Sequence, residues 1–483
     1  MTTENILSFF REIMLIPRES GNEQHIIAYL QDFAKKHNLA CKTDEVGNVL
    51  IVKEATKGME KAPTIILQSH SDMVCEKNSG IEHDFAKDPI QAVVEDGWLI
   101  AKDTTLGADC GIGIAAQLAI LASKDAKHGK IESLFTISEE TGMDGAFGLK
   151  PDFLTGSIFI NLDSEDEGEL FIGCAGGIDT SVEYKYSLEQ APKDIATYTL
   201  KISGGIGGHS GDDIDKERAN AVQLLARFLN TIIITTGKDL YRIFDIDGGN
   251  KRNAIAREAS ATISFDEKQV AKVIEEFEIF LASIKDEYSI SDSNITASFE
   301  ATEISGKCLD KNTSYNLTKG LIAVPHGVLA MSSAVKGLVE TSTNLASVKN
   351  RKDENLIFIG TSQRSAINSS RRFAGDRIEA AFQMAGATKV SHESEYPGWK
   401  PKLDSPILEI SKKAYIDLFH TEPIVRAIHA GLECGLILEK YPDLDMISFG
   451  PTIKGVHAPG ERLDLASLEK FTLLLNEVIT NCK

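Results

Sequence analysis

Histidines and acidic residues follow several runs of apolar and β-branched residues, at points where buried strands would end. His70 and Asp72 follow one such run. Glu139 and Glu140 follow a second run, and Asp163 follows a third. Ligands of open α/β sheets bind outside the carboxyl ends of the strands. Because imidazole and carboxylate groups are donors to Zn²⁺ and similar cations, these segments predict one shared metal site.

Each of these groups also has an ordinary explanation when it is taken alone. A His-x-Asp pair such as His70 and Asp72 is often a hydrogen-bonded pair at the surface. The acids Glu139 and Glu140 can form a solvated turn, and Asp163 has the same ambiguity. Adjacent acids at a mostly buried edge, however, repel each other unless a cation neutralises them or one is protonated.

Two further candidates lie in glycine-rich surroundings. Asp109 stands between Gly107 and Gly111 at the entry to an apolar helix, where aspartate is a good N-cap. A carboxylate there can instead bridge two cations, because glycines let the backbone and metals approach closely. His457 follows Gly455 in a polar loop, where a single histidine would be unremarkable. Taken together, the histidines and acids are the donors expected around a hydrolytic pair of zinc ions, and the set is a stronger signal than any one of its members.

The elements that must position these residues alternate between strand and helix in the first third of the chain. β-Branched runs predict strands, and apolar residues at helical spacing predict a helix. We expect strands at 48–53, 64–68, 131–137 and 157–162 and a helix at 111–123. This alternation predicts an α/β fold with a mixed, largely buried sheet.

The sequence pattern changes in the middle of the chain. Alternating strands and amphipathic helices there predict an α+β insert with a sheet that is open on one side, at 197–203, 258–265, 219–231 and 268–284. We therefore predict three segments, with residues 1–186 as the first part of a catalytic domain, 187–395 as an inserted domain, and 396–483 as the second part of the catalytic domain.

Composition argues against several classes of function. The 483 residues carry a formal net charge of -20, from 51 Lys plus Arg against 71 Asp plus Glu. Such a chain repels nucleic-acid phosphates and anionic lipid, and it has no basic run to override that repulsion. No segment reaches the roughly 20 apolar residues that a membrane span requires. The seven cysteines are scattered without a CxxC pair, which favours reduced thiols and a cytoplasmic location.

The order of these motifs resembles a known family. His-x-Asp, Gly-Ala-Asp, Glu-Glu, Asp and a late Gly-x-His are similar to the cocatalytic zinc peptidases that include glutamate carboxypeptidase, aminoacylase and carnosinase. Longer stretches resemble bacterial aminoacyl-histidine dipeptidases, at 104–109, 142–149, 173–179 and 429–435. The similarity runs nearly end to end.

The resemblance implies a role for each candidate at the strand ends. It implies two Zn²⁺ per subunit, with His70 and Asp163 at one ion, Glu140 and His457 at the other, and Asp109 bridging both. Glu139 matches the general base, and Asp72 matches the acid that supports His70. Relatives often have a cis peptide bond after the bridging aspartate. Mn²⁺ or Co²⁺ can occupy the same donors.

The resemblance also implies substrate-binding residues in the insert, which it makes a lid domain. The glycine-rich segment around His209 lacks the Gly-Lys-Ser/Thr of a phosphate-binding loop but matches the family's Gly-Gly-His-Ser. Asn253 and Arg364 resemble positions that hold substrate. Arg364 is suited to clamp a peptide carboxylate, although a surface ion pair explains it equally well. A homodimer through the lid domain is a further option.

The activity expected from the resemblance is hydrolysis of short peptides, with Xaa-His dipeptides such as carnosine as the preferred substrates. An N-acyl amino-acid deacylase or a tripeptidase would share every metal residue. A catalytically silent zinc-dependent binding protein is disfavoured, because Glu139 is present beside Glu140. No residue in the sequence has to recognise a C-terminal imidazole, so that preference depends on the resemblance alone.

Overall fold

The computed structural model describes residues 1–483, which divide into two compact units. Unit 1 comprises Met1–Cys174, Trp399–Ala427 and Leu432–Lys483. Unit 2 comprises Ala175–Gly398 and Ile428–Gly431. The chain therefore leaves unit 1 after its first third and returns to it near the end, and each unit is described by itself. The assignment of 1–186, 187–395 and 396–483 as catalytic and lid segments stays a prediction.

Unit 1 alternates helices and strands along the chain. Its first part contains α1 (Thr3–Ile13), α2 (Gln24–Lys36), β1 (Ala40–Thr43), β2 (Val49–Lys53), β3 (Ile65–His70), β4 (Ala92–Glu95), β5 (Trp98–Ala101), α3 (Ala108–Ala122), β6 (Ile131–Thr136), α4 (Glu139–Gly142), α5 (Asp144–Gly148), β7 (Ile158–Asn161) and β8 (Glu169–Cys174). Its later part contains α10 (Pro406–Phe419), β20 (Ile424–Ile428), α11 (Glu433–Lys440), β21 (Asp445–Ser448), β22 (Ile453–Lys454), β23 (Arg462–Asp464) and α12 (Leu465–Asn481).

The main sheet of unit 1 is mixed. Its eight strands have the order β1-β2-β6-β3-β7-β21-β8-β20. The four central strands β6, β3, β7 and β21 are parallel, whereas β1 and β2 pair antiparallel at one edge. Because the central strands run the same way, their carboxyl ends meet at one edge of the sheet. The later part of the chain thus adds two strands, β20 and β21, to a sheet begun by the first part.

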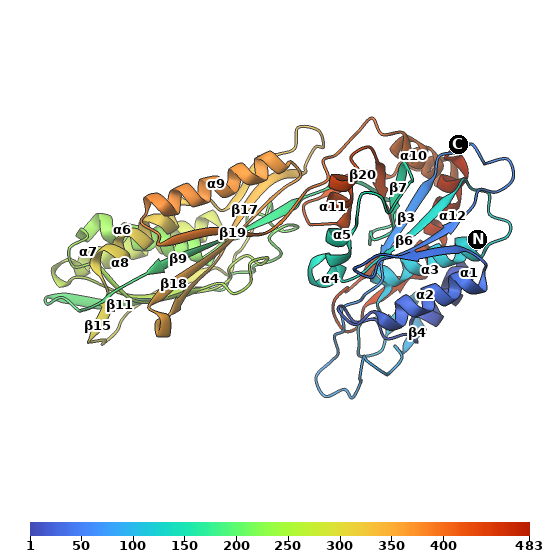
Figure 1. The fold of residues 1–483 in the computed structure, drawn as a ribbon. Coiled ribbons are helices and arrows are strands. Elements are labelled where there is room, and N and C mark those ends of the chain that lie inside the picture. Colours follow the sequence, from blue (N-terminus) through green and yellow to red (C-terminus); the bar gives the residue numbers. More distant parts are fainter. The chain divides into compact units, whose positions relative to one another are not determined.

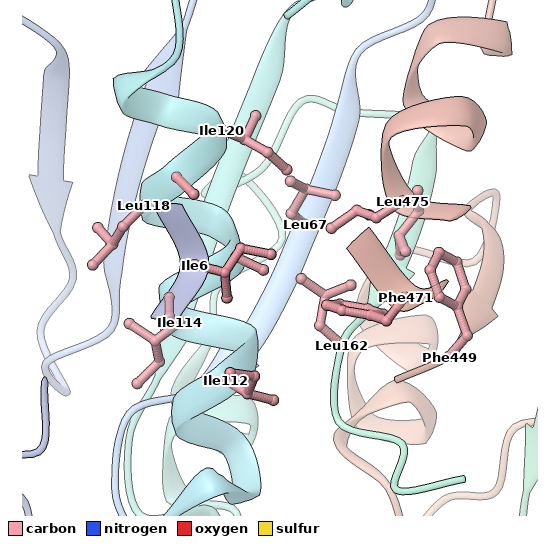
Figure 2. Close-up of a cluster of buried hydrophobic side chains, with 14 of the residues drawn as sticks. Ile6, Leu67, Ile112, Ile114, Leu118, Ile120, Leu162, Phe449, Phe471 and Leu475 are labelled. Carbon is pink, nitrogen blue, oxygen red and sulfur yellow. The ribbon is translucent and has the colours of Figure 1, made fainter. Parts of the chain in front are cut away.

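The core of unit 1 holds this sheet against helices from both ends of the chain. Leu67 of β3 and Leu162, just after β7, lie between side chains of α3 and α12 (Figure 2). Phe471 of α12 is 1% exposed and Ile114 of α3 is fully buried. Burial of each such side chain contributes about 1.5–3 kcal/mol. The contacts therefore fix α3, whose first turn carries Asp109, against the strands that precede the other candidate ligands.

Unit 2 is built on an antiparallel sheet of nine strands, with four helices on one of its faces (Figure 1). Its elements are β9 (Gly176–Lys185), β10 (Leu188–Gln190), β11 (Ile195–Ser203), α6 (Ala221–Thr236), β12 (Arg242–Gly248), β13 (Ala259–Asp266), α7 (Val270–Glu287), β14 (Thr296–Ala301), β15 (Lys307–Leu309), α8 (Lys311–Ala323), β16 (Gly327–Met331), β17 (Val339–Arg351), β18 (Leu356–Ser365), α9 (Asn368–Met384) and β19 (Lys389–Tyr396). The sheet order is β14-β11-β13-β12-β17-β18-β9-β19, with β16 paired to β17.

The observed elements agree with the sequence patterns, and the predicted mixed α/β fold is confirmed. One local feature differs from the solvated turn considered for Glu139 and Glu140, because these residues begin a short helix, α4. Ser138 adopts a left-handed conformation there, and the following glutamates turn at once into that helix. No helix of the protein combines the length and apolar character that crossing a membrane needs.

Candidate metal centre

The carboxyl ends of three parallel strands bring the predicted ligands of unit 1 together. His70 is the last residue of β3, and Asp72 follows in the next loop. Glu139 and Glu140 open α4 after β6, and Asp163 lies just beyond β7. This placement follows from the parallel register of β3 with β6 and β7. The expectation that ligands gather at the carboxyl ends of parallel strands, called the strand-end rule below, therefore placed all of these side chains correctly at one edge of the sheet.

Asp109 lies between the two histidines of the centre. Its Oδ1 atom is 3.0 Å from Nε2 of His70, and its Oδ2 atom is 3.1 Å from Nε2 of His457. The peptide bond from Asp109 to Cys110 is cis, as the family resemblance led us to expect. Each oxygen of this carboxylate thus faces a different imidazole, which is the geometry of a bridging ligand.

Each of the two histidines also lies close to a second carboxylate. Oδ1 of Asp163 is 3.2 Å from Nε2 of His70. Oε2 of Glu140 is 2.9 Å from Nε2 of His457. One side therefore offers His70 with Asp163, and the other offers His457 with Glu140, while Asp109 contributes an oxygen to each.

The donor atoms fit divalent cations. Nδ1 of His70 is 3.2 Å from Oδ1 of Asp72, so a proton on Nδ1 leaves the lone pair of Nε2 pointing at Asp109 and Asp163. A lone pair that faces two carboxylates is repulsive unless a proton or a metal cation lies between them. Although burial opposes the rise, these acids raise the pKa of His70 well above its ordinary value. Oδ1 of Asp163 is also buried without a hydrogen bond. Buried donors of this kind are what Zn²⁺, Mn²⁺ or Co²⁺ would satisfy.

Asp72 is fully buried and orients the neighbouring groups. Its two oxygens accept hydrogen bonds from the Ser20 hydroxyl at 2.7 Å and from the backbone N–H groups of Glu139 at 3.1 Å and Glu140 at 3.2 Å. Burial opposes ionisation of Asp72, but hydrogen bonding with His70, Ser20 and Glu139 outweighs it and lowers the pKa to about 2. Asp72 is thus an anion that fixes both His70 and the start of α4.

Glu139 lies in surroundings that favour its protonated form. Burial raises the pKa of Glu139 well above its ordinary value, His70 opposes the rise, and the charges of Asp163 and Glu140 add to it. Burial likewise raises the pKa of Asp163 to about 6 and that of Glu165 to about 8. The excess of buried carboxylates is therefore the main electrostatic feature of this edge, and bound cations would relieve it.

His457 is the accessible member of the centre. Its side chain is 50% exposed, whereas that of His70 is 1% exposed. Hydrogen bonds to Asp109 and Glu140 raise the pKa of His457 to about 11, with burial opposing them. Among the assigned groups, solvent therefore reaches the imidazole of His457 most readily, whereas the Glu140 side chain is only 6% exposed.

The three predicted substrate-binding residues all belong to unit 2. His209 lies in the glycine-rich loop after β11, and its backbone pairs with Ala254 in an isolated β-bridge. The backbone N–H of Ser210 donates to the carbonyl of Asn253 at 2.8 Å, so Asn253 lies beside the His209 loop. Nδ1 of His209 is 3.4 Å from Oδ2 of Asp212.

Arg364 and His429 form a second polar cluster within unit 2. Arg364 is on β18 and is only 8% exposed, and its Nη1 donates to the hydroxyl of Tyr396 at 3.3 Å. Its Nε has no hydrogen-bond partner. Nε2 of His429 is 2.7 Å from Oγ of Ser342. Burial, with the nearby charge of Arg364, lowers the pKa of His429 to about 3, so this imidazole is neutral.

Sequence reasoning did not assign several residues that support these clusters. His429 lies within a quoted motif, but nothing in the sequence pairs it with Ser342, which is 87 positions away. Glu461 and Arg18 are each 2% exposed and contact the loop that carries Asp109. The available signal for Glu461 was its place four residues after His457, in the same polar loop.

Comparisons with known proteins identify the family of the chain. The profile of the family described as Peptidase family M20/M25/M40 matches residues 66–481. Cytosol non-specific dipeptidase of Escherichia coli (strain K12) is 38% identical over 480 residues, covering 99% of this chain and 98% of that protein. The crystal structure of aminoacylhistidine dipeptidase from Vibrio alginolyticus is 39% identical, with a TM-score of 0.91 over 98% of this chain and 96% of the other. Aminopeptidase PepT from Bacillus cereus ATCC 10987 shares the fold, at 16% identity and a TM-score of 0.58 over 100% and 99% of the two chains.

These similarities confirm the resemblance to metallopeptidases that the motif order indicated. The profile match covers most of the chain, and the two relatives of high identity align almost end to end. Use of divalent metal by such enzymes agrees with the grouping of His70, Asp109 and Glu140, whose donor atoms lie within 4.8 Å of one another. The chain is a metallopeptidase that belongs to Peptidase family M20/M25/M40.

Proposed function

We propose that this enzyme hydrolyses dipeptides, among them Xaa-His dipeptides such as carnosine, at a pair of Zn²⁺ ions. His70 and Asp163 would hold one ion, His457 and Glu140 would hold the other, and Asp109 would bridge them. The proposal depends chiefly on one observation, that the two oxygens of Asp109 face different imidazoles. Oδ1 is 3.0 Å from Nε2 of His70, and Oδ2 is 3.1 Å from Nε2 of His457. A single structural ion would not need two separate donor sets.

The ions would supply Lewis acidity, which polarises a scissile carbonyl and lowers the pKa of water. The protein's own part begins with Asp72, which keeps His70 in one tautomer and one orientation. Glu139 would act as the general base, because it adjoins the assigned ligand Glu140 at the start of α4 and a carboxylate there can accept a proton and return it to the leaving amine. Its acidic neighbours Asp163 and Glu140 would no longer hinder its ionisation once cations balance their charge.

We assign substrate binding to three residues of unit 2, as the family resemblance implies. The Arg364 guanidinium is nearly buried with a free Nε donor, and such a donor suits the C-terminal carboxylate of a dipeptide. His209 and Asn253 lie on neighbouring backbone segments, and we assign them to the substrate's carbonyl group. A free terminal carboxylate close to the scissile bond distinguishes a dipeptide from longer chains.

The substrate class is supported by the names of the two relatives of high coverage, a non-specific dipeptidase and an aminoacylhistidine dipeptidase. The deciding experiment compares carnosine, other Xaa-His dipeptides, Xaa-Leu dipeptides, tripeptides and N-acetyl amino acids on one enzyme preparation, before and after chelation and zinc add-back. We expect metal-dependent cleavage of dipeptides, with Xaa-His among the best substrates. Exclusive cleavage of tripeptides or of N-acetyl amino acids would contradict the assignment.

A cytoplasmic location and a homodimer through unit 2 complete the proposal. The location is supported by seven free cysteines and by the word cytosol in the name of the Escherichia coli relative. Sedimentation of the purified enzyme over a range of concentrations would test the dimer.

A further inference from the structure

Glu461 accepts hydrogen bonds from four consecutive backbone N–H groups. Its Oε2 atom is 2.8 Å from the nitrogen of Leu106 and 3.0 Å from that of Gly107. Its Oε1 atom is 2.8 Å from the nitrogen of Ala108 and 3.3 Å from that of Asp109. The residue is 2% exposed. A buried carboxylate is therefore enclosed by the backbone of the segment that ends in the bridging aspartate.

This contact takes the place of a side-chain cap at the entry to α3. Gly107, the residue before α3, has no side chain that could accept these hydrogen bonds. Asp109 and Cys110 have non-helical backbone angles, so the regular turns of α3 begin only after them. Buried backbone N–H groups need a partner, and Glu461 provides it for the irregular segment 106–109. The segment that leads into α3 is thus fixed by a residue from the loop of His457.

Arg18 holds the same segment from the other side. Its guanidinium donates to the carbonyl of Gly107 and, at 2.6 Å, to the carbonyl of Asp72. Like Glu461, it is 2% exposed. The backbone N–H of Gly107 donates to the carboxylate of Glu461, and the carbonyl of Gly107 accepts from the guanidinium of Arg18. These contacts join the loops that carry His70, Asp109 and His457, three segments that lie far apart in the sequence.

We propose that Glu461 is a positioning residue of the metal centre, which fixes the distance between the bridging carboxylate of Asp109 and the imidazole of His457. It lies four residues after His457 and binds the amides that lead into Asp109, so it connects two ligand-bearing loops directly. This inference rests on the proposed assignment of Asp109 and His457 as ligands. A residue that only stabilised the fold would leave the metal affinity of the folded protein unchanged, so zinc affinity distinguishes a positioning role from a purely structural one.

Unit 1 offers a matched control in Glu132. That residue is also 2% exposed, and its carboxylate accepts hydrogen bonds from the backbone N–H groups of Thr155 at 2.8 Å and Gly156 at 3.1 Å. It lies near the amino end of β6, whereas the metal centre is at the carboxyl end of that strand. Glu132→Gln therefore removes a comparable buried charge without touching a ligand-bearing loop.

The test measures zinc affinity in metal-free Glu461→Gln, Glu461→Asp, Glu132→Gln and wild-type enzyme, by competition with a chromogenic chelator. Loss of a group that orients metal ligands typically weakens metal binding about 10- to 100-fold, and we expect that loss for Glu461→Gln. Glu461→Asp keeps the charge on a shorter side chain, so we expect a smaller loss. Urea unfolding of the metal-free proteins shows how much each variant loses in stability alone.

The outcomes distinguish a failure of the positioning role of Glu461 from a failure of the metal-centre assignment. Equal zinc affinity in Glu461→Gln and wild type, or an equal loss in Glu132→Gln, would overturn the positioning role. If Glu461→Gln does not fold, the zinc affinity of Glu461→Asp tests the positioning role instead. Wild-type zinc affinity and unaltered activity in Glu461→Asp would contradict the proposal. Asp109→Asn tests the underlying assignment, because wild-type zinc binding by that variant would refute the metal centre itself.

Discussion

Nε2 of His457 lies 3.1 Å from Oδ2 of Asp109, although the two residues are 348 positions apart in the sequence. The same carboxylate contacts His70 through its other oxygen, at 3.0 Å. One side chain therefore joins two donor sets, one from the β3 and β7 strand ends and one from α4 and the loop after β22.

Replacement of the bridging carboxylate should abolish metal-dependent activity. Asp109→Asn keeps the size of the side chain but weakens the contact to both cations. Because metal ions contribute several kcal/mol to such reactions, we expect kcat/KM to fall at least about 10³-fold, with less than one metal ion retained per chain. Metal analysis and dipeptide assays would measure both effects. Asp166→Asn is the control, because Asp166 is an exposed partner of Lys454, and it should behave as wild type.

Removal of the assigned base should separate chemistry from metal binding. Glu139→Gln cannot accept a proton, and general-base catalysis contributes about 10²- to 10⁴-fold, so we expect kcat to fall by that factor. Zinc content should stay at the wild-type value, because Glu139 is not one of the five assigned ligands. Normal turnover by a zinc-loaded Glu139→Gln enzyme would show that another group takes the proton.

Arg364 should matter for substrates with a free C-terminal carboxylate. A hydrogen bond to a charged group contributes about 1.5–3 kcal/mol, so Arg364→Gln should raise KM for dipeptides about 10- to 100-fold. It should hardly affect the slower cleavage of the matching dipeptide amides. Arg372→Gln is the control, because Arg372 is 66% exposed and pairs with Glu395. Equal effects on acids and amides would argue against a carboxylate clamp.

Unit 2 should lose stability in mild acid through His326. Nδ1 of His326 is 3.3 Å from both the backbone nitrogen of Leu345 and Nδ2 of Asn220, so it acts as an acceptor. Burial lowers the pKa of His326 to about 4, from an ordinary value near 6.5. Between these pKa values the unfolded chain binds the extra proton, so the free energy of unfolding falls as pH drops, by up to about 1.4 kcal/mol per pH unit.

Urea unfolding of wild type and His326→Gln at several pH values from 7 to 4 would measure this effect. The variant should lose less stability than wild type across that range. The difference between the two proteins should therefore be largest at pH 7 and should shrink as the pH falls. Parallel curves for the two proteins would show that His326 does not contribute to the acid sensitivity.

Much of the candidate metal centre could be predicted because its residues follow local patterns. His70 and Asp163 come directly after β-branched or apolar runs, and the strand-end rule needs only those runs and a parallel sheet. Asp109 was marked by its flanking glycines. The family resemblance then supplied the pairing of ligands, which the residues alone left open.

The supporting contacts were not predictable, because they depend on residues that meet only in the folded chain. Glu461 bonds to backbone amides 352 to 355 positions away, and amide groups carry no sequence signal. The same holds for Arg18, whose partners are carbonyl groups. The start of α4 was missed for a similar reason, because its first N–H groups depend on the buried carboxylate of Asp72.

The most direct test of the two-metal assignment is an anomalous difference map at the zinc edge from crystals grown with zinc. We predict two peaks on opposite sides of Asp109. One peak should contact His70, Asp163 and Oδ1 of Asp109, and the other should contact His457, Glu140 and Oδ2 of Asp109. A single ion enclosed by four protein ligands, or peaks only at sites away from Asp109, would contradict the account.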